Sequence, residues 1–305
     1  MRMRKYIEQA AALGIAYEQD VPMSAKTSFK IGGAAELMLF PASVDQLQAC
    51  IKLCIKSSEA AGPHRRWFIL GCGSNLLVKD SGLDGVVIST ELLTGIALES
   101  GGLISCGAGV KLGELCLFAQ RQGLAGLEFA YGIPGSAGGA VYMNAGAYGG
   151  EMKDVLHSAR YVDTSGEVCE LPAEALELGY RHSVFMRNGG VVAGLTVRLT
   201  PGDPAEIRAK MNDILQKRRD KQPLEFPSAG SVFKRPEGHY AGALIEQCGL
   251  KGRGVGGARV SDKHAGFIVN AGGATAADVR ALIALVQAVV EASTGVFLEP
   301  EIRFV

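Results

Sequence analysis

The stretch GIPGSAGGAVYMNAGAYGG, residues 132–150, is the densest glycine region of a chain in which 41 of 305 residues are glycine. From Gly132 to Gly139 it lets another group approach the backbone closely, and it offers N–H donors together with the Ser136 hydroxyl. Successive backbone N–H groups can form a concave site for an anion. The chain carries 31 Lys+Arg and 31 Asp+Glu, a formal net charge of zero. Local dipoles and a few cations must therefore hold any anionic ligand.

A second glycine turn lies about sixty residues earlier, between apolar strands expected at 67–70 and 76–78. This turn consists of Gly71, Cys72, Gly73, Ser74 and Asn75. It is not the G-x-G-x-x-G fingerprint, because Leu76 stands at the third glycine position and a strand follows instead of a helix. An anion-binding turn and an ordinary tight hairpin both fit this pattern. Two such segments are what a dinucleotide needs if its pyrophosphate lies between two turns.

The chain contains no GxxxxGK[ST], HExxH or GxSxG motif, which argues against a triphosphatase, a zinc protease and an esterase. Its five histidines are scattered, so we predict no metal site and expect His182 and His264 to be structural or supporting residues. The seven cysteines, without a Cys-x-x-Cys pair, are typical of reduced thiols in a cytoplasmic protein. No secretory segment and no membrane span are expected. Zero net charge predicts no nucleic-acid partner.

Helices and strands are mixed along the whole chain, which predicts an α+β fold. Hydrophobic periodicity predicts helices at 44–60, 112–122, 204–219, 241–248 and 276–292, and strands at 86–89, 96–98, 103–106, 159–163, 191–199 and 267–269. The expected N-caps are Ser43, Asp203 and Thr275. A closing strand at 296–304 is expected to direct Glu299, Glu301 and Arg303 to one face, and Leu298, Ile302 and Phe304 mostly to the other. The change of composition at 200–204 predicts a domain boundary.

A family resemblance rests on strings that follow one another over nearly the whole chain. They are TSFKIGG, GCGSNLLV, GIPGSAGGAVYMNAGAYGGEM, YRHSVF, KQPLEFPSAGSVFKRP, LIEQCGLKG, SDKHAGFIVNAGG and LEPEIRF. In this order they resemble the UDP-N-acetylenolpyruvoylglucosamine reductase (MurB) family of flavoenzymes, which act in peptidoglycan precursor synthesis. The short link from Tyr180 to the strand at 191–199 is similar to the second, shorter subtype of that family.

The resemblance implies a two-lobed FAD-binding fold of the vanillyl-alcohol-oxidase type, with lobes at 1–95 and 96–202, followed by an α+β substrate-binding domain at 203–305. It further implies that NADPH donates hydride to FAD and that a UDP-sugar enolpyruvyl substrate is then reduced in the same cleft. The oligomeric state is not indicated by the sequence.

FAD contacts are carried over from the family to both glycine segments. They are Gly71, Cys72, Gly73, Ser74, Asn75, Gly135, Ser136, Gly138, Gly139 and Asn144. Because the first turn holds no histidine that could link covalently to the flavin, FAD is expected to be noncovalent.

Three residues match the catalytic motifs of the family. Arg181 offers a planar fork for the substrate carboxylate, and Ser231 is implied to protonate the carbanionic carbon. Glu301 either holds a proton and donates a hydrogen bond to the developing charge, or orients Arg181 and Ser231. By residue type alone, a surface ion pair, a turn hydroxyl and an edge-strand carboxylate are the alternative roles.

Substrate contacts are expected at Tyr180, Lys221, Lys234 and Arg235. Arg235 stands where many longer relatives carry asparagine, and Gly266 also replaces an expected asparagine. Two alternatives to the reductase are a flavin oxidase of the same fold and a flavin- or nucleotide-binding sensor without turnover. An oxidase needs a base and access for oxygen, whereas the acid–cation–carboxylate trio favours reduction with protonation of carbon.

Overall fold

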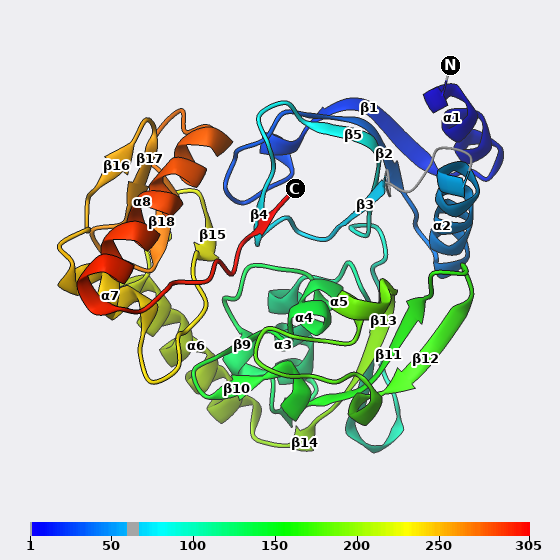
Figure 1. The fold of residues 1–305 in the computed structure, drawn as a ribbon. Helices are drawn as coiled ribbons and strands as arrows, with labels where there is room; N and C mark the ends of the chain where they lie inside the picture. The colour runs from blue at the N-terminus through cyan, green and yellow to red at the C-terminus, as the bar shows by residue number, and fades with distance from the viewer. Residues whose placement is uncertain (1, 60–66) are drawn as a thin grey trace. The chain divides into compact units, whose positions relative to one another are not determined.

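A computed structural model describes residues 2–59 and 67–305 of the chain (Figure 1). The chain divides into two compact units, each built from three separate stretches of sequence. Unit 1 comprises Met1–Gln19, Leu37–Cys72 and Gly85–Gln216, and unit 2 comprises Asp20–Glu36, Gly73–Asp84 and Lys217–Val305. The expected boundaries between the two FAD-binding lobes and the substrate-binding domain, at 95/96 and 202/203, remain predictions.

Unit 1 is built on a five-stranded antiparallel sheet in the order β12-β11-β13-β7-β6. The strands are β6 (Ile96–Leu98), β7 (Leu103–Gly107), β11 (Leu156–Val162), β12 (Val168–Pro172) and β13 (Val191–Arg198). β13, β11 and β12 lie side by side in Figure 1. Along β13, Leu195 and Val197 are buried while Thr196 and Arg198 are not, so one face of the sheet carries the core.

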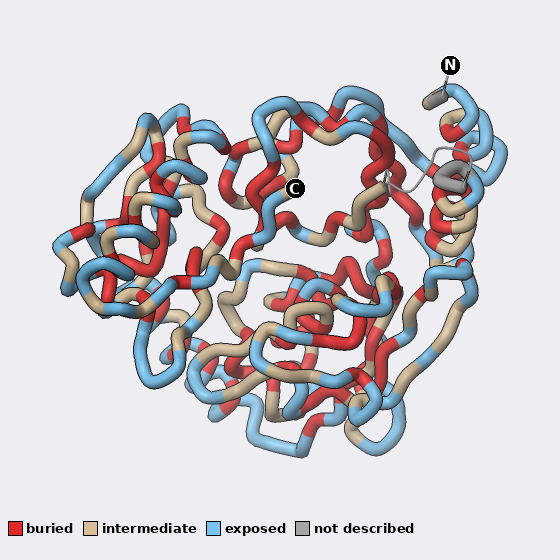
Figure 2. Tube along the Cα trace, in the orientation of Figure 1, coloured by how far each residue is buried: buried red, intermediate tan, exposed pale blue. Residues whose placement is uncertain are grey.

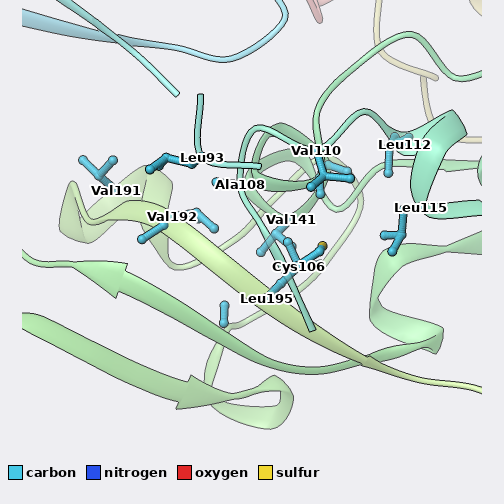
Figure 3. Close-up of a cluster of buried hydrophobic side chains, with 14 of the residues drawn as sticks. Leu93, Cys106, Ala108, Val110, Leu112, Leu115, Val141, Val191, Val192 and Leu195 are labelled. Atoms are coloured by element: carbon cyan, nitrogen blue, oxygen red, sulfur yellow. The ribbon is translucent and has the colours of Figure 1, made fainter. Parts of the chain in front are cut away.

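The helices that contribute most to the core of this unit are α2 (Val44–Glu59), α3 (Leu112–Arg121) and α4 (Ala137–Met143). α4 packs against β13, and Figure 3 shows Val141 of α4 close to Leu195. Leu112 and Leu115 of α3 are buried in the same core, at the helical spacing that the sequence predicts. The stretch 132–150 is therefore not only turns, because its middle forms a helix.

A further four-stranded sheet has the order β1-β2-β5-β3. Its strands are β1 (Ala16–Pro22), β2 (Ala34–Phe40), β3 (Trp67–Leu70) and β5 (Leu83–Ser89). β3 and β5 pair in parallel, with Leu70 opposite Ser89. The remaining elements are α1 (Arg2–Ala12), β8 (Leu124–Ala125), β9 (Gly146–Ala147), β10 (Gly150–Glu151), α5 (Phe185–Asn188), β14 (Thr200–Pro201) and α6 (Pro204–Lys221), together with five short 3₁₀ turns.

Unit 2 contains a four-stranded antiparallel sheet and two helices. The sheet order is β15 (Ser228–Ser231), β18 (Phe267–Asn270), β17 (Ala258–Val260) and β16 (Gly254–Val255), and the helices are α7 (Ala241–Gln247) and α8 (Ala276–Thr294). Buried and exposed positions alternate along α8 in Figure 2, and the buried ones include Val279, Leu282 and Val286. Thr275 caps α8 as predicted, since its hydroxyl accepts from the Asp278 N–H at 3.0 Å.

The other two predicted caps are confirmed as well. The Ser43 hydroxyl accepts from the Gln46 N–H, and the Asp203 carboxylate accepts from the Ala205 N–H. The prediction of a closing strand at 296–304 is mostly wrong. Only β19 (Arg303–Phe304) is a strand there, and it pairs in parallel with β4 (Leu76–Leu77). Pro300 interrupts the strand because it has no N–H to donate to a ladder. Leu298 and Ile302 are buried as expected, whereas Phe304 is 40% exposed.

No helix in the described ranges is long and apolar enough to cross a membrane. All seven cysteines fall within those ranges, and none of them forms a disulfide.

Truncation of Leu115 tests the core of unit 1. Leu115 is fully buried, so Leu115→Ala is expected to lower the free energy of unfolding by about 2–5 kcal/mol. Urea unfolding followed by circular dichroism measures the change. Leu98→Ala is the control, because Leu98 is 49% exposed and its loss should cost no more than about 0.5 kcal/mol. Equal losses in both variants would contradict this assignment of the core.

Candidate active site

The first glycine turn connects strands of two different sheets. β3, before the turn, pairs with β5, whereas β4, after it, pairs with β19. The two strands therefore do not pair with each other, and the hairpin alternative is wrong. The boundary between the two units falls inside this turn, between Cys72 and Gly73.

In unit 1, the start of this turn meets the second glycine segment. A Cβ built on Gly71 would lie 2.8 Å from the Ser136 hydroxyl oxygen, so any other residue here would displace that hydroxyl from its present position. The Cys72 thiol is hydrogen-bonded to the same hydroxyl. Desolvation of the sulfur raises the pKa of Cys72, so this thiol is neutral near pH 7. The predicted pairing of the two glycine segments is thus present within one unit.

The N–H groups of the second segment are mostly used inside the protein. Those of Ala137 and Gly138 donate to the carbonyls of Val110 and Ala108, and that of Gly139 donates to the Ser136 hydroxyl. The expected N–H donors of this segment therefore do not include those of Gly138 and Gly139. Gly138 is required for packing, because a Cβ there would lie 2.6 Å from the Ala108 Cβ.

Other N–H groups of this segment are not used in this way. Within the part of the chain that the structure describes, those of Gly135 and Ser136 have no protein acceptor. They are consecutive, and they lie directly before α4. Two adjacent N–H groups of this kind suit an anionic group.

In unit 2, residues 26–28 support the rest of the first turn. Gly73 has a φ of +62°, and a Cβ there would lie 2.2 Å from the Lys26 carbonyl oxygen. Ser28 donates its N–H to the Gly73 carbonyl at 3.2 Å and its hydroxyl to the Ser228 carbonyl at 2.7 Å. Ser28 thus joins the glycine turn to β15. Our sequence interpretation gave this residue no role, and its place in TSFKIGG was the only available signal.

The same unit brings Ser231 and Glu301 to neighbouring segments. Ser231 ends β15, and the Glu301 N–H donates to the carbonyl of the next residue, Val232, at 2.7 Å. The Asn75 side chain donates to the Glu301 carbonyl at 3.2 Å. Both Ser231 and Glu301 are partly exposed. Glu301 is therefore hydrogen-bonded both to Asn75 of the first glycine turn and to the residue that follows Ser231.

The predicted substrate cations of unit 2 differ in their surroundings. Lys234 forms an ion pair with Glu299, which reduces the charge it can offer an anion. The Arg235 guanidinium lies over the Tyr240 ring, 4.1 Å from its centre. Lys221 is exposed at the end of α6.

Arg181 lies at the tip of a tight hairpin in unit 1. Gly179 and His182 exchange both of their N–H···O hydrogen bonds, at 3.1 and 3.2 Å, which leaves Tyr180 and Arg181 as the loop. Arg181 has a φ of +53°, a left-handed conformation that is unusual for a long side chain. Its guanidinium lies 5.4 Å from the centre of the exposed Tyr180 ring. Backbone strain of this kind is often found at functional sites.

Asn144 does not fit its predicted role as a cofactor contact. The residue is buried, with 1% of its surface exposed, and its amide is hydrogen-bonded to Glu151, Gly179 and Lys153. No donor of this side chain is left for a cofactor.

Comparison with known proteins assigns the family. Residues 222–305 match the model of the UDP-N-acetylenolpyruvoylglucosamine reductase C-terminal domain, and residues 35–172 match that of an FAD binding domain. A UDP-N-acetylenolpyruvoylglucosamine reductase of Clostridium perfringens is 47% identical to this chain over 99% of both sequences. One of Alkaliphilus oremlandii is 48% identical over 94% of the chain and 92% of its own length. The chain belongs to the UDP-N-acetylenolpyruvoylglucosamine reductase family.

The MurB crystal structure from Thermus caldophilus has the same fold, with 33% identity and a TM-score of 0.78 over 95% of this chain and 98% of that one. The predicted fold class, an FAD-binding fold of the vanillyl-alcohol-oxidase type followed by an α+β domain, is confirmed. The residues that match the FAD binding domain model, 35–172, include both glycine segments.

Substitution of Gly73 tests the glycine turn. Gly73→Ala is expected to displace the turn from the Lys26 carbonyl, and so to weaken flavin binding and to lower stability by about 1–3 kcal/mol. Flavin fluorescence and urea unfolding measure the two effects. The control is Gly113→Ala in α3, where a Cβ meets nothing within 4 Å and stability should rise by about 0.5–1 kcal/mol. Unchanged flavin affinity in Gly73→Ala would contradict the assignment.

The pH dependence of stability tests whether His264 supports the segment next to β15. The His264 Nδ1 accepts from the Gly266 N–H at 3.1 Å, and the Gly266 carbonyl accepts from the Val232 N–H. Burial lowers the pKa of His264 below its ordinary value of 6.5. As the pH falls below about 6.5, the unfolded chain takes up this proton first, so stability is lost as the pH falls through the lowered folded pKa.

Urea midpoints between pH 7.5 and 5 measure this effect. We expect a smaller loss of stability over that range in His264→Gln than in the wild type, because glutamine does not titrate. Parallel curves for the two proteins would show that His264 is not the group responsible.

Proposed function

We infer that this chain reduces UDP-N-acetylenolpyruvoylglucosamine to UDP-N-acetylmuramate, with bound FAD and with NADPH as the hydride donor. The observation that carries this inference is the match over 99% of the chain to reductases of that name. The enzyme is an FAD-containing oxidoreductase of peptidoglycan precursor synthesis. A flavin oxidase and a non-catalytic flavin sensor, the two alternatives, have no comparable support.

The parts of the two glycine segments that lie in unit 1 suit the pyrophosphate of FAD. A Cβ on Gly71 would displace the Ser136 hydroxyl, and the consecutive N–H groups of Gly135 and Ser136 have no acceptor in the described part of the protein. These residues, with Gly73, Ser74 and Asn75 of the same turn, are proposed to hold FAD without a covalent bond. When bound, FAD supplies to the substrate the hydride that it takes from NADPH.

Reduction of the enolpyruvyl double bond leaves negative charge on the carbon beside the carboxylate, and three residues are proposed to manage it. Arg181 binds the substrate carboxylate with two parallel N–H groups, and its charge persists as negative charge develops. Ser231 donates its hydroxyl proton to that carbon. A serine hydroxyl is a weak acid, but the carbanionic carbon is strongly basic, which makes the transfer favourable.

Glu301 is proposed to act on the same charge. Its backbone is bonded to Val232, so its position follows that of the Ser231 segment. It either donates a hydrogen bond as a neutral acid or orients Arg181 and Ser231 as a carboxylate. Glu301→Gln separates these roles, because the amide keeps a neutral donor and removes the negative charge.

Lys221, Lys234 and Arg235 are proposed to face the substrate diphosphate, and Tyr180 to cover the substrate. Of these residues, Lys234 is expected to attract the diphosphate least, because Glu299 already pairs with it. The cytoplasm is proposed as the location, in keeping with seven free cysteines. A nucleic-acid partner is not proposed, since the net charge is zero.

Loss of the Ser231 hydroxyl tests the reaction. In Ser231→Ala, anaerobic NADPH should bleach the flavin at a rate within about threefold of the wild type. Reoxidation by the enolpyruvyl substrate should slow by about 10²–10⁴-fold, the usual contribution of a positioned acid. Stopped-flow absorbance follows both steps.

The control is Ser228→Ala, a substitution in the same strand that should affect neither step. Normal reoxidation in Ser231→Ala would remove Ser231 as the acid. A wild-type protein that carries no flavin would remove the proposed function itself.

A further inference from the structure

The hairpin that carries Arg181 is fastened to the C-terminal end of α4 at two points. On one side, the Asn144 amide nitrogen donates to the Gly179 carbonyl at 2.9 Å. On the other side, the hydroxyl of the fully buried Ser183 donates to the Tyr142 carbonyl at 2.7 Å. One bond ends on Gly179, directly before the two-residue loop, and the other starts from Ser183, two residues after it, so together they hold both sides of the Arg181 hairpin.

The Asn144 amide has no freedom to make other bonds. Its nitrogen also donates to Glu151 Oε2 at 2.7 Å, and its oxygen accepts from the Lys153 N–H at 2.9 Å. The Lys153 N–H can only donate, and the Glu151 carboxylate and the Gly179 carbonyl can only accept. The three partners therefore determine which end of the amide is oxygen. An aspartate in this place would set a carboxylate against two acceptors.

The backbone of Asn144 also favours an asparagine. Its φ is +42°, and it caps α4 in the left-handed conformation, which asparagine tolerates better than most residues. Glu177 and Arg181, with φ of +50° and +53°, place two more strained residues in the hairpin segment. Such conformations persist only where the surrounding structure holds them. The hydrogen bonds from α4 provide that constraint.

We propose that Asn144 is a positioning residue for Arg181: it holds the hairpin so that the guanidinium has one place, and it makes no contact with FAD. The proposal rests on the proposed function, in which Arg181 binds the substrate carboxylate. Ser183 is the second fastening of the same hairpin. A misplacement of about 1 Å in a substrate-binding group can lower a rate by about 10²-fold.

Asn144→Gly is the main test, because glycine keeps the left-handed backbone and removes only the side chain. In the holoenzyme, we expect the flavin spectrum and the rate of bleaching by NADPH to stay within threefold of the wild type. Reoxidation by the enolpyruvyl substrate should slow by 10-fold or more, and the KM for that substrate should rise. Asn144→Asp should be at least as damaging, because it keeps the size of the side chain and loses both donors.

A structural readout separates positioning from a general loss of stability. Hydrogen exchange should become faster in the peptide 176–187 of Asn144→Gly and stay unchanged in α3. Ser183→Ala should also make hydrogen exchange faster in the same peptide. Asn188→Ala is the matched control: the Asn188 side chain accepts from the Gly190 N–H at 2.9 Å, outside the hairpin, and alanine keeps the helical backbone of α5. It should change neither exchange in the hairpin nor reoxidation.

The possible outcomes are distinct. If Asn144→Gly loses flavin, or slows bleaching as much as reoxidation, the residue acts on FAD and the proposal is overturned. If exchange in 176–187 does not change, the hairpin is held without Asn144, and the proposal is again overturned. If the wild type does not reduce the enolpyruvyl substrate at all, the proposed function fails, while hydrogen exchange still decides whether Asn144 holds the hairpin.

Discussion

Helix α4 is the physical constraint on which the site in unit 1 depends. It has seven residues, from Ala137 to Met143, and an α-helix rises by about 1.5 Å per residue. Ser136 at its start and Asn144 at its end are therefore held roughly 12 Å apart. Ser136 meets the first glycine turn, and Asn144 holds the hairpin of Arg181. One short helix thus links the segment proposed to hold FAD with the hairpin of the residue proposed to bind the substrate carboxylate.

The glycines around this helix are needed mainly because other groups approach their backbone closely, and less because of the N–H donors they offer. Gly138 allows the start of α4 to reach Ala108, and Gly71 allows the first turn to reach Ser136. Because the N–H groups of Gly138 and Gly139 are already bonded, the anion-binding capacity falls to Gly135 and Ser136. Adjacent N–H groups without a protein acceptor can form a concave site for an anion, which is the basis of the FAD contact proposed here.

Unit 2 builds its part of the chemistry from the main chain. The C-terminal segment is irregular at Pro300 and is held beside β15 by the bonds between Glu301 and Val232 and between Lys234 and Glu299. Ser28 ties β15 to the Gly73 turn. Segments from the beginning, the first quarter and the end of the sequence thereby converge near Ser231. The bonds include main-chain pairs, Glu301 N–H to Val232 and Lys234 N–H to Glu299, and side-chain contacts of Ser28 and Lys234.

The sequence by itself determined the features that depend on neighbouring residues. The buried spacing of α3, the caps at Thr275 and Asp203 and the strand before Gly71 follow from local patterns, and the order of the strings was enough to assign the family. Only the tertiary structure decided the role of Asn144, the support of the Gly73 turn by Ser28 and the irregular path around Pro300. Their partners lie 35 to 200 residues away in the chain, and periodicity carries no information about such distant contacts.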